Sequence, residues 1–469
     1  MKMSPGVDLR RDGVGRLMFR LAAPAILAQV INALYNIVDR IYIGRLPEEI
    51  STQCIAALGI SLPLIVVISA FGTMIGVGGS ALAAIRMGEK KNGEANRILN
   101  NCLPPLIGLS VVICILCQLF CRDLLLLVGA TENIIDYAVQ YFQLYAWGTL
   151  PVLLVLGLNP FINTQGLATT SMLTVLIGAV TNIVLDPILI FGFDLGVCGA
   201  AIATVISQSI SAIWVVCFLC GKKTRLRLRI SEMRVRWSLL GPVLALGISP
   251  FIMNSTESLV GIVINVTIRS VSPDLATAET YLGAYTIIAS VMQLVMLPLT
   301  GLGQGAQPII SYNYGARQCA RVKQAYFLFL RCCLVFTGVV CISALLFPTV
   351  FVRLFNNDPA LLEATVPALR IYICMVTMFG VQSACQQTFL ATGQAKISLF
   401  LALLRKVILL IPLIFLFSRF WGILGIFIAE PVADTLAATS TATVFYLRRK
   451  SIFETPAGTA GEELPAKGV

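Results

Sequence analysis

Long apolar runs separated by short polar turns make up most of this 469-residue chain. Each run has about 20 residues or more, the length that an α-helix needs to cross the hydrocarbon core of a bilayer. The runs cover residues 17–43, 53–82, 98–120, 134–157, 164–192, 197–220, 239–268, 280–310, 322–350, 361–389, 396–418 and 421–447. This pattern predicts an all-α integral membrane protein with twelve transmembrane helices.

The basic residues divide unequally between the two sides of the predicted membrane. One side receives the N-terminus, the C-terminal tail and the basic stretches 83–97, 221–237, 311–331 and 396–406. The other side receives only scattered arginines, which are Arg40, Arg45, Arg122, Arg269, Arg353, Arg370 and Arg419. Because loops rich in Lys and Arg stay in the cytoplasm, we expect a multi-pass protein of the cell (cytoplasmic) membrane with both termini cytoplasmic.

Composition excludes several classes of protein. With 57% hydrophobic and 12% charged residues, the chain is far more apolar than soluble proteins, in which about 25% of residues are charged. The formal net charge of +11 lies in short stretches between apolar runs, without interleaved aromatic residues, so we expect no nucleic-acid partner. The 14 cysteines show no metal-ligand spacing together with histidine, so we expect no resident metal and no cofactor.

The motifs of membrane enzymes are also missing from the sequence. We find no serine-hydrolase elbow, no zinc-protease signature and no Walker-type phosphate loop, which argues against an enzyme and against an ATP-driven pump. The chain contains no histidine. Any proton carrier within it must therefore be a carboxylate.

The two halves of the chain repeat one another at a constant offset of about 226 residues. Prolines, glycines and a tyrosine fall into register, and the pairs include Pro24 with Pro250, Gly78 with Gly305, Gly88 with Gly315, and Tyr145 with Tyr372. Six helices per half is an even number, so the halves form a parallel repeat, and a transport site is expected where they meet. We expect an N-lobe at 1–220, a basic cytoplasmic linker at 221–238, a C-lobe at 239–450 and a cytoplasmic tail at 451–469.

A carboxylate next to a proline lies inside the fifth apolar run. An ionised Asp in the hydrocarbon region costs roughly 3 kcal/mol or more, so Asp186 marks an ion site or pathway. Pro187 removes a backbone hydrogen bond and tends to bend the helix, and Asn182 lies one turn earlier on the same face. Together they could hold a cation or a proton. The alternative is a buried Asp neutralised by a neighbour for packing reasons.

A second acid, Asp39, ends a polar stripe on the first run. The stripe recurs at spacings of three and four residues and consists of Gln29, Asn32, Asn36 and Asp39. It should face the interior of the bundle, where Gln29, Asn32 and Asn36 are candidates for the wall of a substrate cleft. Both Asp39 and Asp186 fall in the outer part of the membrane, so we expect them to meet. In the second half an amide, Asn265, aligns with Asp39, and an apolar position near Leu413 aligns with Asp186.

The second half carries acids of its own at mid-membrane depth. Glu257 lies in the seventh run, and Glu430 and Asp434 lie one turn apart in the twelfth, beside Arg405 and Lys406 of the eleventh. Two interpretations of Glu430 and Asp434 stay open: an ion-pair network with Arg405 that locks two helices, or a part in transport.

Several aromatic and methionine side chains are candidates for the wall of a substrate cleft. Flat cations bind to aromatic faces, and methionine packs adaptably around varied ligands. The candidates are Tyr35, Tyr141, Tyr145, Tyr281 and Met292. Ordinary helix packing is the alternative for each.

Six segments that follow one another along the chain are LAAPAILAQVINALYNIVDRIYIG, GVGGSALAAIRMGEKKNGEANR, NIVLDPILIFGFDLGVCGAAIAT, GLGQGAQPIISYNYGAR, FLATGQAKISLFLALLR and GILGIFIAEPVAD. Together and in this order they resemble the multidrug and toxic compound extrusion (MATE) family, in its prokaryotic multidrug-type branch. The resemblance implies two six-helix lobes around a V-shaped central cleft. It also implies export of small organic cations and drugs by antiport with H+ or Na+. We expect the chain to be a monomer surrounded by membrane lipid.

The same resemblance assigns roles to individual residues. The family's N-lobe cation site, which could also take Na+, matches Asp39, Asn182, Asp186 and Thr204, and its helix-bending proline matches Pro24. Pro187 is a second bending point. Glu257 matches an acid of the C-lobe, but the acid that accompanies it in the tenth helix is replaced by Gln382, Gln386 and Gln387.

Two rival functions differ from drug export. A flippase for a lipid-linked saccharide, or for another amphipathic substrate of the same superfamily, would need a cleft rich in Arg and Lys to meet a pyrophosphate. A receptor or scaffold would leave buried acids at matched depth without a role.

Overall fold

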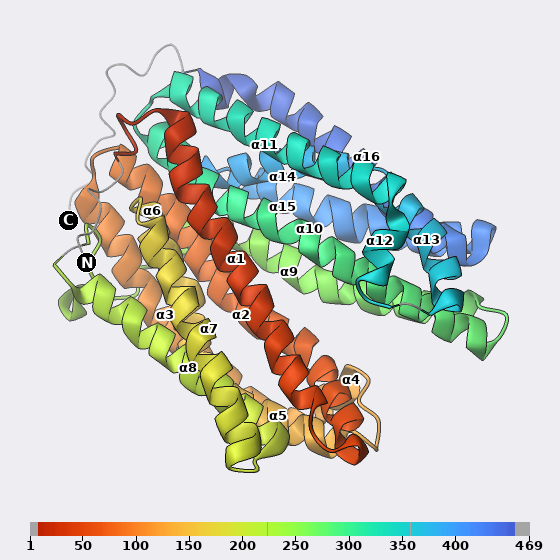
Figure 1. Cartoon of the computed structure of the whole chain (residues 1–469). Coiled ribbons are helices and arrows are strands. Elements are labelled where there is room, and N and C mark those ends of the chain that lie inside the picture. The colour runs from red at the N-terminus through yellow and green to blue at the C-terminus, as the bar shows by residue number, and fades with distance from the viewer. Residues whose placement is uncertain (1–7, 223, 357, 455–469) are drawn as a thin grey trace.

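The computed structural model describes residues 8–222, 224–356 and 358–454 (Figure 1). Within these ranges the regular elements are helices and no strand occurs. The prediction of an all-α protein is therefore confirmed. The end of the predicted cytoplasmic tail, residues 455–469, lies outside the described residues.

The first half of the chain contains eight α-helices and one short π-helix. They are α1 (Val14–Gly44), α2 (Glu48–Gly88), α3 (Asn92–Leu119), α4 (Cys121–Leu127), α5 (Ile135–Trp147), α6 (Thr149–Thr164), α7 (Ala168–Pro187), the π-helix η1 (Ile188–Gly192) and α8 (Gly196–Cys220).

The second half repeats this succession of long helices. It contains the 3₁₀ turn η2 (Ile230–Glu232), α9 (Trp237–Val271), α10 (Leu275–Gly315), α11 (Cys319–Leu346), α12 (Pro348–Arg353), α13 (Pro359–Ile373), α14 (Val376–Ala391), α15 (Ala395–Leu403), the π-helix η3 (Leu404–Leu410) and α16 (Ile411–Phe453).

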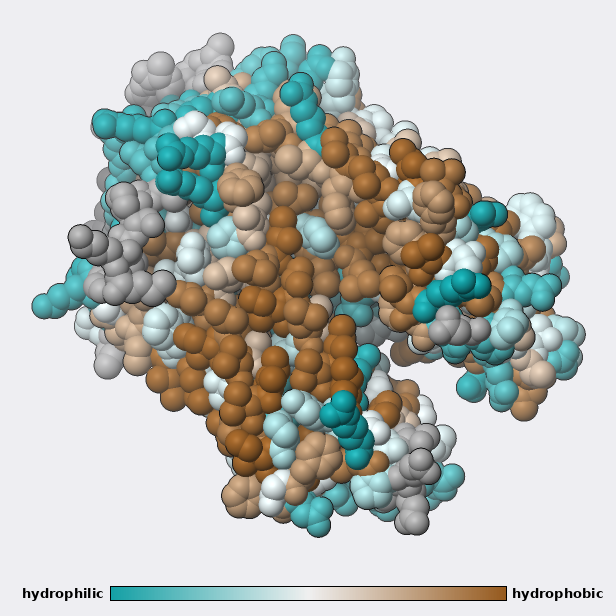
Figure 2. Space-filling model, in the orientation of Figure 1, coloured by the Kyte–Doolittle hydropathy of each residue, from teal (hydrophilic) through white to brown (hydrophobic). Residues whose placement is uncertain are grey.

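Nine of the described helices are long and apolar enough to cross a membrane, and the number rises to eleven if each of two bent pairs counts as one span. The bent pairs are α5 with α6, at 53°, and α13 with α14, at 44°. One of the nine, the 59-residue segment Ala395–Phe453, far exceeds the ~20 residues that a span needs. It is interrupted at Gly422, whose φ of 57° is not helical. Figure 2 shows an apolar surface between two polar ends, as a membrane protein requires.

One pair of predicted helix boundaries was wrong. The sequence predicts that the fourth run ends at residue 157 and the fifth begins at 164, whereas α6 continues to Thr164 and α7 begins at Ala168. The polar residues near the end of α6 resemble a turn in the sequence, but they bond to other helices. Asn159 donates to the Ser171 carbonyl oxygen, and Asn163 to that of Gln304 in the second half.

Glycines allow the helices of the two halves to cross closely. A Cβ at Gly78 of α2 would overlap the Val243 carbonyl oxygen of α9, and a Cβ at Gly305 of α10 would overlap Ala22 of α1. Small residues let the backbones of two membrane helices approach closely, and the resulting van der Waals packing holds such helices together. At the end of the molecule where α4 and α5 of the first half and α12 and α13 of the second half lie, the helices of the two halves diverge (Figure 1). The surface is hollowed between them (Figure 2).

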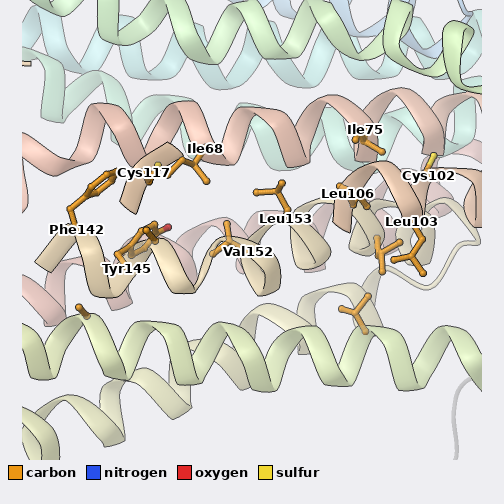
Figure 3. Close-up of a cluster of buried hydrophobic side chains, with 14 of the residues drawn as sticks. Ile68, Ile75, Cys102, Leu103, Leu106, Cys117, Phe142, Tyr145, Val152 and Leu153 are labelled. Carbon is orange, nitrogen blue, oxygen red and sulfur yellow. The ribbon is translucent and has the colours of Figure 1, made fainter. Parts of the chain in front are cut away.

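The first half has an apolar core that supports α5 and α6 (Figure 3). Leu103 and Leu106 of α3, Ile75 of α2 and Leu153 of α6 are buried in it together with Phe142 of α5. This packing fixes α5 against its neighbours, and α5 in turn carries two of the tyrosines singled out in the sequence.

The predicted linker is bound to the first half. The side-chain oxygen Oε1 of Gln165 accepts hydrogen bonds from the Thr224 hydroxyl and from the main-chain N–H groups of Arg225 and Leu226, at 2.7–2.9 Å. Asn100 of α3 accepts from the Arg229 N–H at 2.7 Å. The described part of this basic segment is therefore held on α3 and α6.

Candidate functional site

The polar cluster predicted in the first half forms around the end of α7. Asp186 has no exposed surface and Asn182 is 1% exposed. The Asn182 amide nitrogen donates to Asp186 Oδ1 at 3.1 Å and lies 3.5 Å from the Thr204 hydroxyl of α8. Three of the four residues expected in the cation site are thus connected by side-chain hydrogen bonds.

Asp39, the fourth expected member, approaches from α1. It is 7% exposed, and α1 packs against α7. Its carboxyl group lies within electrostatic range of Asp186. The structure therefore brings the two acids of the first half into one neighbourhood, although they are separated by most of that half in the sequence.

This cluster contains buried oxygen atoms that lack hydrogen-bond partners. They are Asp39 Oδ1, Asn182 Oδ1 and Asp186 Oδ2. Buried polar atoms are normally satisfied, and carboxylate and amide oxygens attract cations and protons. The group of free acceptors fits either H+ or Na+. Among the described residues no cluster of three or more Asp, Glu, Cys or His side chains forms a metal site.

The backbone changes character directly after Asp186. Pro187 closes α7, and the next five residues, Ile188–Gly192, form a π-helix. Proline removes a helical hydrogen bond, and π-helices recur at functional sites because they redirect neighbouring side chains. Pro24, the other predicted bending point, lies within α1, which is assigned as one continuous helix from Val14 to Gly44.

Three tyrosines lie in the same part of the first half as the acids. Tyr141 and Tyr145 of α5 are buried, and their rings stack with centroids 6.3 Å apart. Tyr141 lies within electrostatic range of Asp39, Asp186 and Tyr35 of α1. These three tyrosines therefore belong to the neighbourhood of the acid pair, and their contact with a substrate stays a prediction.

The rest of the polar stripe on α1 is less enclosed. Gln29 is half-buried, whereas Asn32 and Asn36 are exposed. The Asn36 amide donates to the Asn32 carbonyl oxygen at 2.7 Å, so this part of the stripe partly satisfies itself. Its role as cleft wall stays a prediction.

The second half contains a separate charged network. Arg405 of η3 contacts Asp434 at 2.6 Å and Glu430 at 3.2 Å, both on α16. Lys406 contacts Glu430 at 3.6 Å and Glu257 of α9 at 3.1 Å. The expected ion pairs of Glu430 and Asp434 with Arg405 are therefore present, and a part of these acids in transport stays a prediction. Lys406, which the sequence assigned to a cytoplasmic basic stretch together with Arg405, is instead buried between helices.

A small cavity adjoins this network. Gln382 and Gln386 of α14 line it with Glu257, Lys406 and Arg405. The Gln386 amide nitrogen donates to the Ser249 hydroxyl at 2.9 Å and to the Ser398 carbonyl oxygen at 2.7 Å. The sequence singled out Glu257 and Gln382 separately, and the structure brings them to one cavity. The sequence placed Arg405 and Lys406 beside the acids of the second half, but it did not predict that Lys406 pairs with Glu257.

Two predicted cleft residues lie elsewhere in the second half. Tyr281 and Met292, both on α10, are half-buried beside an apolar cluster. The Tyr281 ring centroid is 6.4 Å from that of Phe427. Neither residue lines the cavity, and their role in binding stays a prediction.

Comparisons with known proteins agree over nearly the whole chain. It is 24% identical over 442 residues to the multidrug export protein MepA of Staphylococcus haemolyticus, covering 94% of this chain and 95% of that one. It is 25% identical over 445 residues to MepA of Staphylococcus aureus (strain NCTC 8325 / PS 47), with the same coverage.

Solved structures share the fold. A crystal structure of MATE in the bent conformation superposes with a TM-score of 0.88 at 22% identity, covering 96% of this chain and 99% of that chain. An outward-facing multidrug resistance MATE family transporter of the MOP superfamily gives a TM-score of 0.87 at 22% identity, covering 97% and 100%.

The family assignment rests on a match to both halves of the chain. The sequence model of the MatE family matches residues 24–188 and again residues 250–416. The two matches begin 226 residues apart, at Pro24 and at Pro250, which is the offset of the internal repeat. The chain therefore belongs to the MatE family, the multidrug and toxic compound extrusion transporters, and is a multi-pass membrane transporter and not an enzyme.

Proposed function

We propose that this chain exports organic cations, including drugs, by antiport with H+ or Na+. The single observation that carries the proposal is the buried cluster of Asp39, Asn182 and Asp186, in which three oxygen atoms lack partners. The names of the MepA relatives support the choice of drugs as substrates.

Coupling follows from shared occupancy of the acids. Two carboxylates in a site of low dielectric repel each other unless a cation or a proton lies with them. If the coupling ion and the cationic substrate both need these carboxylates, binding of one lowers the affinity for the other. Inward flow of H+ or Na+ then drives outward release of the substrate.

We propose twelve transmembrane helices in two six-helix lobes. Counting each bent pair as one span, and dividing the last segment at Gly422, gives twelve. A symmetric exchange of contacts supports the lobes. A Cβ at Gly88 would overlap the Tyr312 carbonyl oxygen, and a Cβ at Gly315 would overlap that of Ile85. Gly88 and Ile85 are the repeat partners of Gly315 and Tyr312, so each lobe offers the same surface to the other.

The close contacts between lobes also suggest an orientation. They gather at the ends of α2 and α10 that adjoin the basic stretches 83–97 and 311–331, which the positive-inside rule places in the cytoplasm. The lobes diverge at the other end (Figure 1). We infer an outward-open cleft in the cytoplasmic membrane, with both termini cytoplasmic. Both candidate sites lie within one chain, which supports a functional monomer in lipid.

No observation favours the alternative of a lipid-linked saccharide flippase. Such a substrate carries a pyrophosphate and needs uncompensated basic groups. Arg405 and Lys406, the buried basic residues of the second half, are outnumbered by Glu257, Glu430 and Asp434. In the described part of the first half, the buried charged residues are two acids, Asp39 and Asp186.

Uptake of a fluorescent organic cation into everted membrane vesicles tests the proposal. A proton gradient with an acidic lumen, and a sodium gradient with a sodium-rich lumen, are imposed separately. We expect concentrative uptake with one of the two gradients and its collapse when that gradient is dissipated. Uptake that ignores both gradients would overturn the antiport mechanism.

A further inference from the structure

The cavity of the second half has a small volume, and several polar and charged side chains contribute to its largely apolar wall. It encloses about 110 Å³ between α9, α14 and η3. Pockets for whole drug-sized ligands usually enclose about 300–1,000 Å³. This cavity therefore has room for the charged head group of an amphipathic molecule, but not for the entire molecule.

The charges around the cavity do not balance. Three carboxylates, Glu257, Glu430 and Asp434, are connected to two basic groups, Arg405 and Lys406. The four buried groups, Arg405, Lys406, Glu430 and Asp434, balance one another, and the additional negative charge is that of the exposed Glu257. A cation that enters the cavity can therefore pair with Glu257 while the buried charges remain balanced.

Lys406 lies between an exposed and a buried carboxylate and could move from one to the other. Its ammonium lies between Glu257 at 3.1 Å and Glu430 at 3.6 Å. Glu430 Oε2 is buried and has no hydrogen-bond partner, so Glu430 can accept the ammonium more fully. The side chain of Glu257 is 68% exposed, compared with 6% for Lys406 and 3% for Glu430. Glu257 is thus the carboxylate that an entering cation can reach.

Two further acceptors on the cavity wall lack donors. Oε1 of Gln382 and Oε1 of Gln386 are buried without hydrogen-bond partners, and both residues line the cavity. The amide nitrogen of Gln386 is already engaged by Ser249 and Ser398, which fixes the orientation of that amide. A ligand that satisfies these oxygens must donate hydrogen bonds. A quaternary ammonium has no N–H group and cannot do so.

We propose that this cavity binds the head group of a cation that carries N–H donors, a guanidinium or a primary ammonium. Glu257 is its counter-ion, and the carbonyl oxygens of Gln382 and Gln386 accept from it. Lys406 occupies the place of that head group in the ligand-free protein and moves fully to Glu430 when the ligand enters. Lys406 is therefore a specificity-determining residue that competes with weak or donor-free cations. This inference rests on the proposed export of organic cations in one respect, which is that it regards the ligand as a substrate.

Equilibrium binding separates this inference from the proposed function because it needs no ion gradient. The full-length chain in lipid nanodiscs is titrated calorimetrically with phenylguanidinium and with phenyltrimethylammonium, which share a ring and a charge but differ in N–H donors. We expect phenylguanidinium to bind about tenfold or more tightly, since hydrogen bonds to charged groups are strong. Equal affinities would overturn the donor requirement.

Variants test the role of Lys406. Lys406→Met combined with Glu430→Gln removes one charge of each sign, which protects folding, and is expected to tighten phenylguanidinium binding about tenfold by removing the internal competitor. Glu257→Gln is expected to abolish binding. Lys396→Met is the matched control, because it makes the same change at an exposed lysine of α15. Unchanged or weaker binding by the double variant would overturn the proposal. Tight binding without efflux would instead contradict the export function alone.

Discussion

The Asn182 amide nitrogen donates to Asp186 Oδ1 at 3.1 Å, across one turn of α7. This bond engages one oxygen of the carboxyl group and leaves the other, Oδ2, without a partner. Asn182 therefore holds Asp186 in one orientation while preserving an acceptor for a cation or a proton. Asp39 supplies a second free oxygen from α1.

We predict that Asp39→Asn and Asp186→Asn each abolish coupled efflux while the protein still folds. Asparagine keeps the shape of aspartate but can neither bind a proton at neutral pH nor neutralise a cation. The measurement is cation uptake into everted vesicles with an imposed gradient, and size-exclusion chromatography checks folding. Asp136→Asn is the control, since the side chain of Asp136 is 78% exposed. Transport at the wild-type rate by both variants would contradict the assignment of Asp39 and Asp186 to the coupling site.

Arg405 should be essential for stability. Its guanidinium bonds two buried carboxylates, Glu430 and Asp434, and lies 4.2 Å from the ring centroid of Phe379. Arg405→Met leaves both carboxylates buried without it, a loss that typically costs about 3–5 kcal/mol. We expect a large fall in the thermal unfolding temperature, partly restored by adding Asp434→Asn. An unfolding temperature like that of the wild type would show that the pair contributes little.

Local chemistry in the sequence predicted part of this site, because Asn182 and Asp186 lie four residues apart on one helix face. Whether Asp39 approaches Asp186 depends on the topology of the helices. The polar stripe and the equal depth of the two acids in the membrane were sufficient to predict it. The pairing of Lys406 with Glu257 was beyond such reasoning. It depends on the π-helix Leu404–Leu410, and no pattern of hydrophobic residues distinguishes that segment from an α-helix.

The fold was predicted more completely than the helix ends. Apolar runs and the repeat indicated the succession of helices, since each span must satisfy its own backbone hydrogen bonds in lipid. Asn159, Asn163 and Gln165 resembled a turn because their side chains are polar. Their partners lie on other segments, which the sequence near them does not reveal.

The crossing of α2 with α9 should tolerate no side chain at Gly247. A Cβ there would overlap the Met74 carbonyl oxygen, whereas a Cβ at Gly241 of the same helix would meet nothing within 4 Å. We predict that Gly247→Ala destabilises the protein by about 1–3 kcal/mol through overpacking. Gly241→Ala should be neutral or slightly stabilising, since alanine favours the helix by about 1 kcal/mol. Thermal unfolding in detergent measures both, and equal effects would contradict the close crossing.

The last prediction concerns how the two halves divide the work. Among the described residues Asp39 and Asp186 form no ion pair, whereas Glu257 pairs with Lys406 and Glu430 with Arg405 and Lys406. Coupling to H+ or Na+ should therefore reside in the first half, and Glu257 should govern which organic cations bind. We expect Asp186→Asn to remove gradient-driven transport while phenylguanidinium still binds at the cavity beside Glu257, and Glu257→Gln to abolish that binding while a donor-free cation is still exported with coupling. Both variants are measured side by side in vesicles and by calorimetry. If Glu257→Gln eliminates coupling and Asp186→Asn merely weakens binding, the roles of the halves are reversed.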